Sequence, residues 1–290
     1  MPCSGATYLQ IIKKPRHRAD NHDQVIHVTS LGPLFWMLRP LKNSSTQSSL
    51  QNLRFFLTKP HDCSYLGSHE ATTLFMDPHT PVDHDMYSAL TLMGFRRSGT
   101  HLYRPHCQEC NACVSVRVPV DDFEPDRSLR RTERNNQDLE VIERPAVFDD
   151  EHYALYERYI STRHSDGEMY PPAIEQYRAF LNIAHDFSRL VEFRLEGRLL
   201  AVAAVDFLTH GLSAIYTFFD PDDAFRSRSM GSWAVIWQIR RAQSLGLKHV
   251  YLGYWIHKSQ KMDYKQRFKP LEYLQGHRWR RGIPITQTHH

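Results

Sequence analysis

The chain has 290 residues and a formal net charge of +4, with 41% hydrophobic and 23% charged residues. This balance is that of a folded protein and excludes wholesale disorder and fibrous repeats. The length predicts two domains. No stretch approaches the roughly 20 apolar residues of a spanning helix, and the chain start lacks a secretion signal. We therefore expect a cytoplasmic protein with no membrane partner.

The charge is unevenly distributed along the sequence. Residues 225–290 contain thirteen Lys or Arg and two acidic residues, a net charge of +11, which leaves −7 for the first 224 residues. A basic lobe predicts a polyanionic partner, and the aromatic residues interleaved with these cations suit stacked bases and phosphates. An ordinary solvated basic face is the alternative.

The first half contains few clear elements. Residues 1–50 are poorly patterned and are expected to form a loose N-terminal extension. In a predicted domain at 51–145, we expect strands at 53–57 and 114–118 and a helix at 85–93 that Gly94 ends. The charged stretch 121–144 is interpreted as a linker or a solvated helix.

The second half is patterned throughout. Apolar periodicity predicts helices at 148–163, 173–184 and 230–245 and strands at 191–195, 199–208, 212–219 and 249–255. This order resembles the centre of the Gcn5-type acetyltransferase fold. We therefore predict an α+β protein: an acyl-CoA N-acyltransferase-like domain at 146–283, with a mixed sheet and flanking helices. A smaller Cys-containing N-terminal domain precedes it, and a tail at 284–290 follows.

Three cysteines lie within seven residues, at Cys107, Cys110 and Cys113. This spacing allows thiolates to surround one soft ion, and zinc or an iron–sulfur cluster would fit. Cys63 is the expected fourth ligand, with His61, His101 or His106 as substitutes. Small buried apolar cysteines are the alternative.

Two further segments carry candidate chemistry. The loop 219–232 resembles a coenzyme A pyrophosphate loop at Arg228 and Gly231, but Trp233 occupies the last small position. A different activated acyl donor is therefore favoured over coenzyme A.

After the last clear strand, Lys258, Lys261 and Lys265 recur at helical spacing, which suits an acidic acceptor or a phosphate. An ordinary basic helix is the alternative.

At this point the sequence resembles the arginyl-tRNA–protein transferase family, in particular its shorter bacterial branch, over about residues 49–282. The motifs that carry the resemblance are Cys63-Ser64-Tyr65-Leu66, the segments 87–99 and 103–113, Tyr251-Leu252-Gly253-Tyr254-Trp255-Ile256 and Lys261-Met262-Asp263-Tyr264-Lys265. One departure is Gly67-Ser68, where the family usually has Pro-Gly.

The resemblance implies an enzyme that moves an amino acid from a charged tRNA to the N-terminus of a protein. The bacterial branch moves leucine from leucyl-tRNA to N-terminal Asp or Glu and so creates an N-degron for protein degradation. The expected partners are aminoacyl-tRNA and acceptor proteins, not DNA. Because the ester is already activated, transfer requires no cofactor. The resemblance also links Cys63, Cys107, Cys110 and Cys113 to zinc or iron–sulfur binding.

On this reading, cations recognise the acidic acceptor side chain and tyrosines orient the reacting groups. The substrate-binding candidates are Arg96, Arg97, Arg104, Lys258, Lys261, Tyr264 and Lys265. The catalytic candidates are Tyr216, Asp220 and Tyr254, although Asp220-Pro221 also suits a plain turn. The tRNA-binding candidates are Arg226, Arg228, Arg240 and Arg241.

Other functions remain open on the sequence alone. Arginine could replace leucine as the transferred amino acid. A coenzyme A-dependent N-acetyltransferase is a second enzyme class that fits the fold. A non-catalytic RNA-binding or redox-sensing protein is the binding-module alternative.

Overall fold

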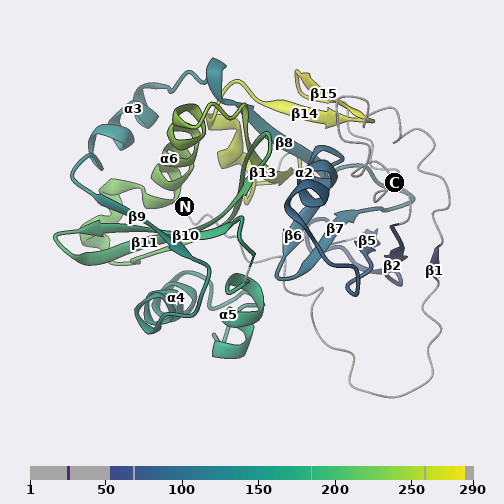
Figure 1. The fold of residues 1–290 in the computed structure, drawn as a ribbon, viewed down its shortest axis with the longest axis horizontal. Coiled ribbons are helices and arrows are strands. Elements are labelled where there is room, and N and C mark those ends of the chain that lie inside the picture. The colour runs from purple at the N-terminus through teal and green to yellow at the C-terminus, as the bar shows by residue number, and fades with distance from the viewer. Residues whose placement is uncertain (1–24, 27–52, 68, 184, 258, 285–290) are drawn as a thin grey trace.

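A computed structural model describes residues 25–26, 53–67, 69–183, 185–257 and 259–284. Within these residues the chain forms an eight-stranded, a five-stranded and a two-stranded sheet (Figure 1). Apart from Val25–Ile26, the expected N-terminal extension lies outside the described residues, as do Lys258 and residues 285–290 of the expected tail.

The eight-stranded sheet is mixed. Its strands β12 and β13 are parallel, with helix α6 between them in sequence, and the remaining neighbours are antiparallel. Parallel neighbours need such a crossover, because a tight hairpin can join only antiparallel strands. In spatial order the strands are β15 (Arg278–Arg281), β14 (Glu272–Gln275), β8 (Val114–Pro119), β13 (His249–Trp255), β12 (Gly211–Phe219), β11 (Arg198–Leu208), β10 (Ser188–Leu195) and β9 (Glu140–Pro145).

The smaller sheets are built from the first part of the chain. The five-stranded sheet has the order β1 (Val25–Ile26), β2 (Phe55–Leu57), β5 (Thr73–Met76), β7 (His101–Pro105) and β6 (Arg96–Ser98). The two-stranded sheet pairs β3 (His61–Asp62) with β4 (Glu70–Ala71).

Helices cover both faces of the large sheet (Figure 1). The described helices are α2 (His84–Leu92), α3 (Arg127–Arg134), α4 (Asp150–Arg163), α5 (Ile174–Leu181) and α6 (Met230–Ser244), with 3₁₀ turns η4 (Val120–Asp122), η5 (Asp223–Arg228) and η6 (Asp263–Arg267). Helices α4 and α5 pack on one face of the large sheet and α6 on the other, with α3 beside α6, whereas α2 shares a core with the five-stranded sheet. Along β11, Leu200 and Ala203 join the core that includes α6, whereas Val202 and Ala204 join the core of α4 and α5. Burial on both faces explains why this strand is a continuous apolar run rather than an alternating one.

The predicted mixed α+β class is confirmed, as is the order of strands and helices from residue 188 to 255. The stretch 121–144 contains helix α3 and most of β9, not a simple linker. Strands β8 and β9 precede the predicted boundary near residue 145 but belong to the large sheet. The division into domains therefore stays a prediction. No helix among the described residues combines the length and apolar character needed to cross a membrane.

A buried ion pair connects the two larger sheets. Arg97 of β6 donates from Nε and Nη2 to the two carboxylate oxygens of Asp206 on β11, each at 2.7 Å. Its Nη1 donates to the carbonyl of Gly99 at 2.8 Å, and the Ser188 hydroxyl donates to Asp206 at 2.7 Å. Both charged side chains are at most 2% exposed. Each guanidinium nitrogen and each carboxylate oxygen thus has a hydrogen-bond partner, as burial of a charge pair demands.

We predict that Arg97→Met lowers the free energy of unfolding by about 3–5 kcal/mol, because it leaves the Asp206 carboxylate buried and unpaired. Arg97→Lys should recover only part of this loss, since an ammonium cannot form the bidentate contact. Denaturant unfolding measures both variants. A loss below about 1 kcal/mol for Arg97→Met would show that the pair does not hold the sheets together.

Candidate functional site

The central feature of the large sheet is the point where β12 and β13 separate. In the described chain they pair where Gly211–Ser213 faces His249–Tyr251 and then diverge. Register irregularities lie beside this point, between Ala204 and Val205 on β11 and between Tyr251 and Gly253 on β13. Backbone groups released at such a split need other partners, because a buried unpaired polar group is costly.

Arg96 supplies those partners from β6. Its Nη1 donates to the Ser213 hydroxyl at 2.9 Å and, more weakly, to the Tyr251 carbonyl at 3.4 Å, and its Nη2 donates to the Ala214 carbonyl. Gly253 lies against the guanidinium with a φ of +82°, a backbone conformation that residues other than glycine rarely adopt. Within the described residues, no carboxylate lies in ion-pair distance of Arg96. A buried cation held by neutral oxygens leaves the region positively charged.

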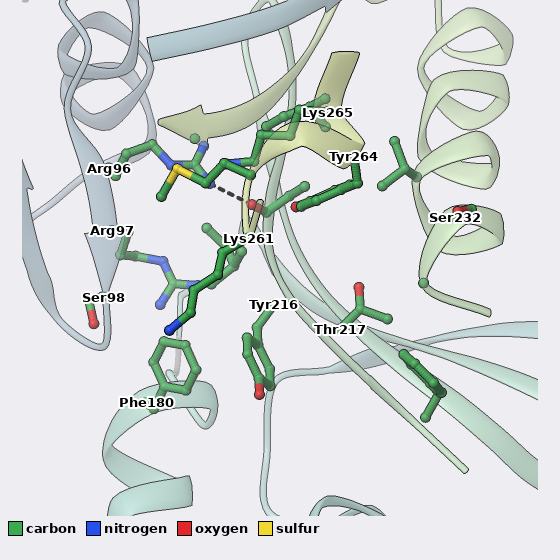
Figure 2. Close-up of a pocket in the computed structure, with 18 of the residues that line it drawn as sticks. Arg96, Arg97, Ser98, Phe180, Tyr216, Thr217, Ser232, Lys261, Tyr264 and Lys265 are labelled. Carbon is green, nitrogen blue, oxygen red and sulfur yellow. Dashed lines mark hydrogen bonds between the residues drawn. The ribbon is translucent and has the colours of Figure 1, made fainter. Parts of the chain in front are cut away.

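The separation of the strands opens into a pocket of about 140 Å³, which we call the central pocket (Figure 2). This volume is about ten times what a single water needs, so the pocket suits a small organic group. Its walls come from β6, β12, β13, η6, the first turn of α6 and the sides of α4 and α5.

The central pocket has a cationic part and an aromatic part. The cations are Arg96, Arg97, Lys261 and Lys265, and the rings of the aromatic part are Tyr159, Phe180, Tyr216 and Phe219. Among the described residues, no Asp or Glu lines it. Because Arg97 is neutralised by Asp206, the uncompensated charge belongs to the other three cations. Such a lining favours a ligand that is acidic at one end and apolar at the other.

Lys265 is the most perturbed of these cations. It is 5% exposed, and its Nζ donates to the Tyr254 carbonyl. Burial first, and then the charge of Arg96, lowers its pKa to about 7. Near neutral pH this amine therefore exists in both protonated and neutral forms, and its neutral form can accept a proton.

Two other predicted residues reach the same pocket. Lys261 is exposed, and Figure 2 shows its amine projecting toward the Phe180 ring. The Tyr216 hydroxyl is buried without a hydrogen-bond partner in the described residues. Burial raises the pKa of Tyr216 far above its ordinary value. Its phenol therefore remains protonated and can offer only a neutral hydroxyl.

A second pocket, of about 270 Å³, collects every described cysteine. We call it the cysteine pocket; its lining includes Cys63, Cys107, Cys110 and Cys113 together with His69 and His106. The predicted alternative ligands His61 and His101 are not in its lining. Backbone N–H groups of Leu66 and Ala112 point at the sulfurs of Cys63 and Cys110, each at 3.4 Å.

The thiols fit a soft metal in kind but not in arrangement. Burial, followed by the charges of Cys63, Cys107 and Cys110, raises the pKa of the Cys113 thiol. No group of three or more described His, Cys, Asp or Glu residues is arranged to hold a metal ion. Zinc or iron–sulfur binding at these cysteines therefore stays a prediction, and no chemical step is derived from it.

Arg104, Asp220 and Tyr254 are not in the lining of the central pocket. Arg104 and Tyr254 line the cysteine pocket, and the Tyr254 hydroxyl donates to the Gly94 carbonyl at 2.7 Å. Asp220 accepts from Arg198 at 2.8 Å and lies 3.6 Å from Arg158. Lys258 falls outside the described residues, whereas Tyr264 lines the central pocket.

The predicted tRNA-binding arginines occupy the outer side of η5 and α6, where most are paired with acids. Arg228 contacts Asp138 at 2.8 Å, Arg240 contacts Glu133 at 2.7 Å and Arg241 contacts Glu143 at 2.7 Å, while Arg226 is exposed and 3.7 Å from Asp223. Their role in RNA binding stays a prediction.

Several pocket residues were not singled out from the sequence. Tyr159 and Phe180 follow the apolar periodicity of their helices and are typical core residues, and Phe219 is the last residue of a buried strand. Ser232 in the first turn of α6 also lines the pocket. Only the three-dimensional arrangement shows that these side chains line the pocket between β12 and β13.

Most of this sequence matches known proteins of one family. Residues 61–131 match the model for the N terminus of arginine-tRNA-protein transferase, and residues 151–275 match the model for its C terminus. An aspartate/glutamate leucyltransferase of Chromohalobacter salexigens is 60% identical over 84% of this chain and 100% of its own length. Another, of Pseudomonas fluorescens, is 53% identical over 80% of this chain and 98% of its own.

A solved structure, that of L-PGS from Bacillus licheniformis, aligns with 90% of this chain and 92% of its own at 11% identity and a TM-score of 0.42, a likeness too low to support an inference. The family is assigned from the sequence matches alone. Both halves of the family model match in order, and relatives of 50–60% identity span most of the chain. This chain is therefore a member of the arginine-tRNA–protein transferase family.

Proposed function

We propose that this protein transfers leucine from leucyl-tRNA to the N-terminal Asp or Glu of acceptor proteins, which marks them for degradation. Membership of the transferase family and the names of the relatives at 50–60% identity support the reaction. The main structural support for this reaction is the lining of the central pocket. One part of the lining is cationic, another part is aromatic, and no described Asp or Glu belongs to it. We assign the catalytic part to a Gcn5-type acyltransferase fold, on the order β10, β11, β12, α6, β13.

The cationic part suits the acceptor. An N-terminal Asp or Glu carries a carboxylate that Arg96 and Lys261 would attract, and a charge-assisted hydrogen bond inside a pocket is stronger than one in water. An N-terminal Asn or Gln has the same shape without the charge. The pocket therefore selects acids by electrostatics more than by size.

The aromatic part suits the donor side chain. Tyr159 and Phe219 lie 4.9 Å apart between ring centroids, and Phe180 and Tyr216 lie 5.4 Å apart. These rings offer an apolar surface to a leucyl side chain. An arginyl side chain would bring a further cation to a pocket that already holds several, with no described carboxylate to receive it. This favours leucine over arginine as the transferred amino acid.

The transfer itself is an aminolysis of an activated ester. The neutral α-amine of the acceptor attacks the ester carbonyl of leucyl-tRNA, a new C–N bond forms, and the C–O bond to the ribose breaks. The amine nitrogen loses a proton to become the amide, and the ribose oxygen gains one. Before this step the α-ammonium, with a pKa of about 7.7–8.0, must lose a proton.

We assign that first proton to Lys265. Lys265 lines the central pocket, and its pKa of about 7 provides a neutral amine near the pH at which the ammonium begins to dissociate. A general base is most effective when its pKa lies near the working pH. Arg96 contributes indirectly, because its charge favours the neutral form of Lys265.

A transfer assay with purified protein tests the proposed function. Labelled leucyl-tRNA and labelled arginyl-tRNA are each supplied with peptides that begin with Asp, Glu, Arg or Ala. We expect label from leucyl-tRNA on the Asp and Glu peptides, and little from arginyl-tRNA. Equal transfer of both amino acids would contradict the aromatic-pocket argument, and transfer of neither would overturn the function.

Lys261→Ala is expected to raise the KM for an Asp peptide about tenfold, since one charge-assisted contact contributes on the order of 1.5–3 kcal/mol and this side chain is exposed. The KM for leucyl-tRNA should change little. Lys269→Ala removes another exposed lysine that does not line the pocket and serves as the control. If both variants behave alike, Lys261 does not read the acceptor.

The pH dependence of transfer tests Lys265. Its proton is lost as the pH rises through about 7, so the rate should increase across that interval and again as the acceptor amine deprotonates near 8. Lys265→Met should lower kcat roughly 100-fold and abolish the step near 7 while retaining the step near 8. An unchanged pH profile in a folded Lys265→Met protein would exclude Lys265 as the base.

A further inference from the structure

Helix α3 presents a dense arginine surface that the reaction described above does not use. Arg127, Arg130, Arg131 and Arg134 are all exposed, and none forms an ion pair within the described part of the chain. The one acid between them, Glu133, is bonded to Arg240 of α6 at 2.7 Å. We call these four residues the α3 arginine surface.

This surface is unfavourable for the helix alone. The arginines recur at spacings of three and four residues, where like charges face one another and destabilise a helix. The acids nearby do little to offset them: Asp126 caps the helix by accepting from the Leu129 N–H at 2.7 Å, and Glu124 precedes the cap. An exposed cationic face that opposes local stability is typical of a surface that meets an anion.

The α3 arginine surface begins beside the central pocket. The guanidinium of Arg267 donates from Nη2 to the Ser128 hydroxyl of α3 at 3.2 Å and from Nη1 to the Ser232 hydroxyl of α6 at 3.3 Å. Ser232 lines the central pocket. One side chain therefore separates the first turn of α3 from the pocket wall. Leu129, fully buried, anchors the helix against the same core as α6.

We propose that the α3 arginine surface binds the phosphate backbone of the acceptor stem of the aminoacyl-tRNA while its aminoacyl end enters the central pocket. This assignment rests on the proposed function. The eight residues of α3 span roughly 12 Å, and one strand of a duplex carries a phosphate about every 3.4 Å, so three or four phosphates fall along the helix. Arginine is suited to them because its planar fork makes paired hydrogen bonds to phosphate oxygens.

This tRNA-binding surface differs from the one expected from the sequence, which consisted of arginines on η5 and α6. Arg228, Arg240 and Arg241 are held by carboxylates and would have to break those pairs to contact RNA. The arginines of α3 have no carboxylate to release within the described residues, and among them only Arg130 makes a side-chain hydrogen bond there, from Nη1 to the Pro125 carbonyl. Their segment precedes the +11 region, which is why net charge along the chain did not reveal them.

The test compares Arg127→Gln/Arg131→Gln with the wild type. Binding of leucyl-tRNA is measured as a function of salt, and the KM values for leucyl-tRNA and for an Asp peptide are measured separately. We expect a tRNA KM raised roughly tenfold or more and a salt slope reduced by about 2, because each phosphate contact contributes about 0.9. The peptide KM should stay unchanged, and near-ultraviolet circular dichroism should confirm the fold.

Two control variants distinguish the effect of removing positive charge from the effect of removing it on α3. Arg127→Lys/Arg131→Lys keeps the charge and should retain most of the salt slope. Lys59→Gln/Arg189→Gln removes two cations elsewhere and should leave the tRNA KM unaltered. If the wild type transfers leucine but the Gln pair on α3 binds tRNA normally, the proposal is overturned and the proposed function stands. If the wild type transfers nothing, the proposed function itself has failed.

Discussion

The architecture depends on how the chain satisfies the backbone where β12 and β13 separate. Parallel strands that part inside a sheet release carbonyl and amide groups in a dry environment, and each unpaired group costs free energy. Arg96 enters from another sheet and donates to Ser213, Ala214 and Tyr251. The gap can thus persist as a pocket rather than close into an ordinary ladder.

Two adjacent arginines on β6 have different electrostatic consequences. Arg97 is neutralised by Asp206 and connects the sheets, whereas Arg96 is held by neutral oxygens and keeps its charge at the pocket. That charge lowers the pKa of Lys265, after the larger effect of burial. Under the proposed function, the short strand β6 would thus link the connection between the sheets to acceptor selection and proton transfer. The aromatic wall, built from α4, α5 and β12, completes the site by offering the apolar surface that the cations cannot.

Local sequence patterns predicted much of the fold but not the arrangement of the site. Periodicity and caps identified α4, α6 and strands β10 to β13 to within a few residues, because those elements are stabilised by their own amphipathic or apolar patterns. The hairpin of β14 and β15 was not predicted, and its pairing with β8 spans about 150 residues of sequence. Lys261 and Lys265 were expected on a helix, but Lys265 lies in the short turn η6 and Lys261 precedes it. Nothing local distinguishes Arg96 from Arg97 or marks Phe180 as a pocket residue, since those roles arise from contacts between distant segments.

The central claim is that one pocket receives both the acidic acceptor and the leucyl group. A crystal structure of the protein with a stable amide analogue of leucyl-adenosine and a peptide beginning with Asp would test it most directly. We predict that the peptide carboxylate lies within hydrogen-bond distance of Arg96 or Lys261, the leucyl side chain against Phe180 and Tyr216, and the peptide amine near Lys265. Density for the carboxylate outside the central pocket, or for the leucyl group away from the aromatic rings, would contradict it.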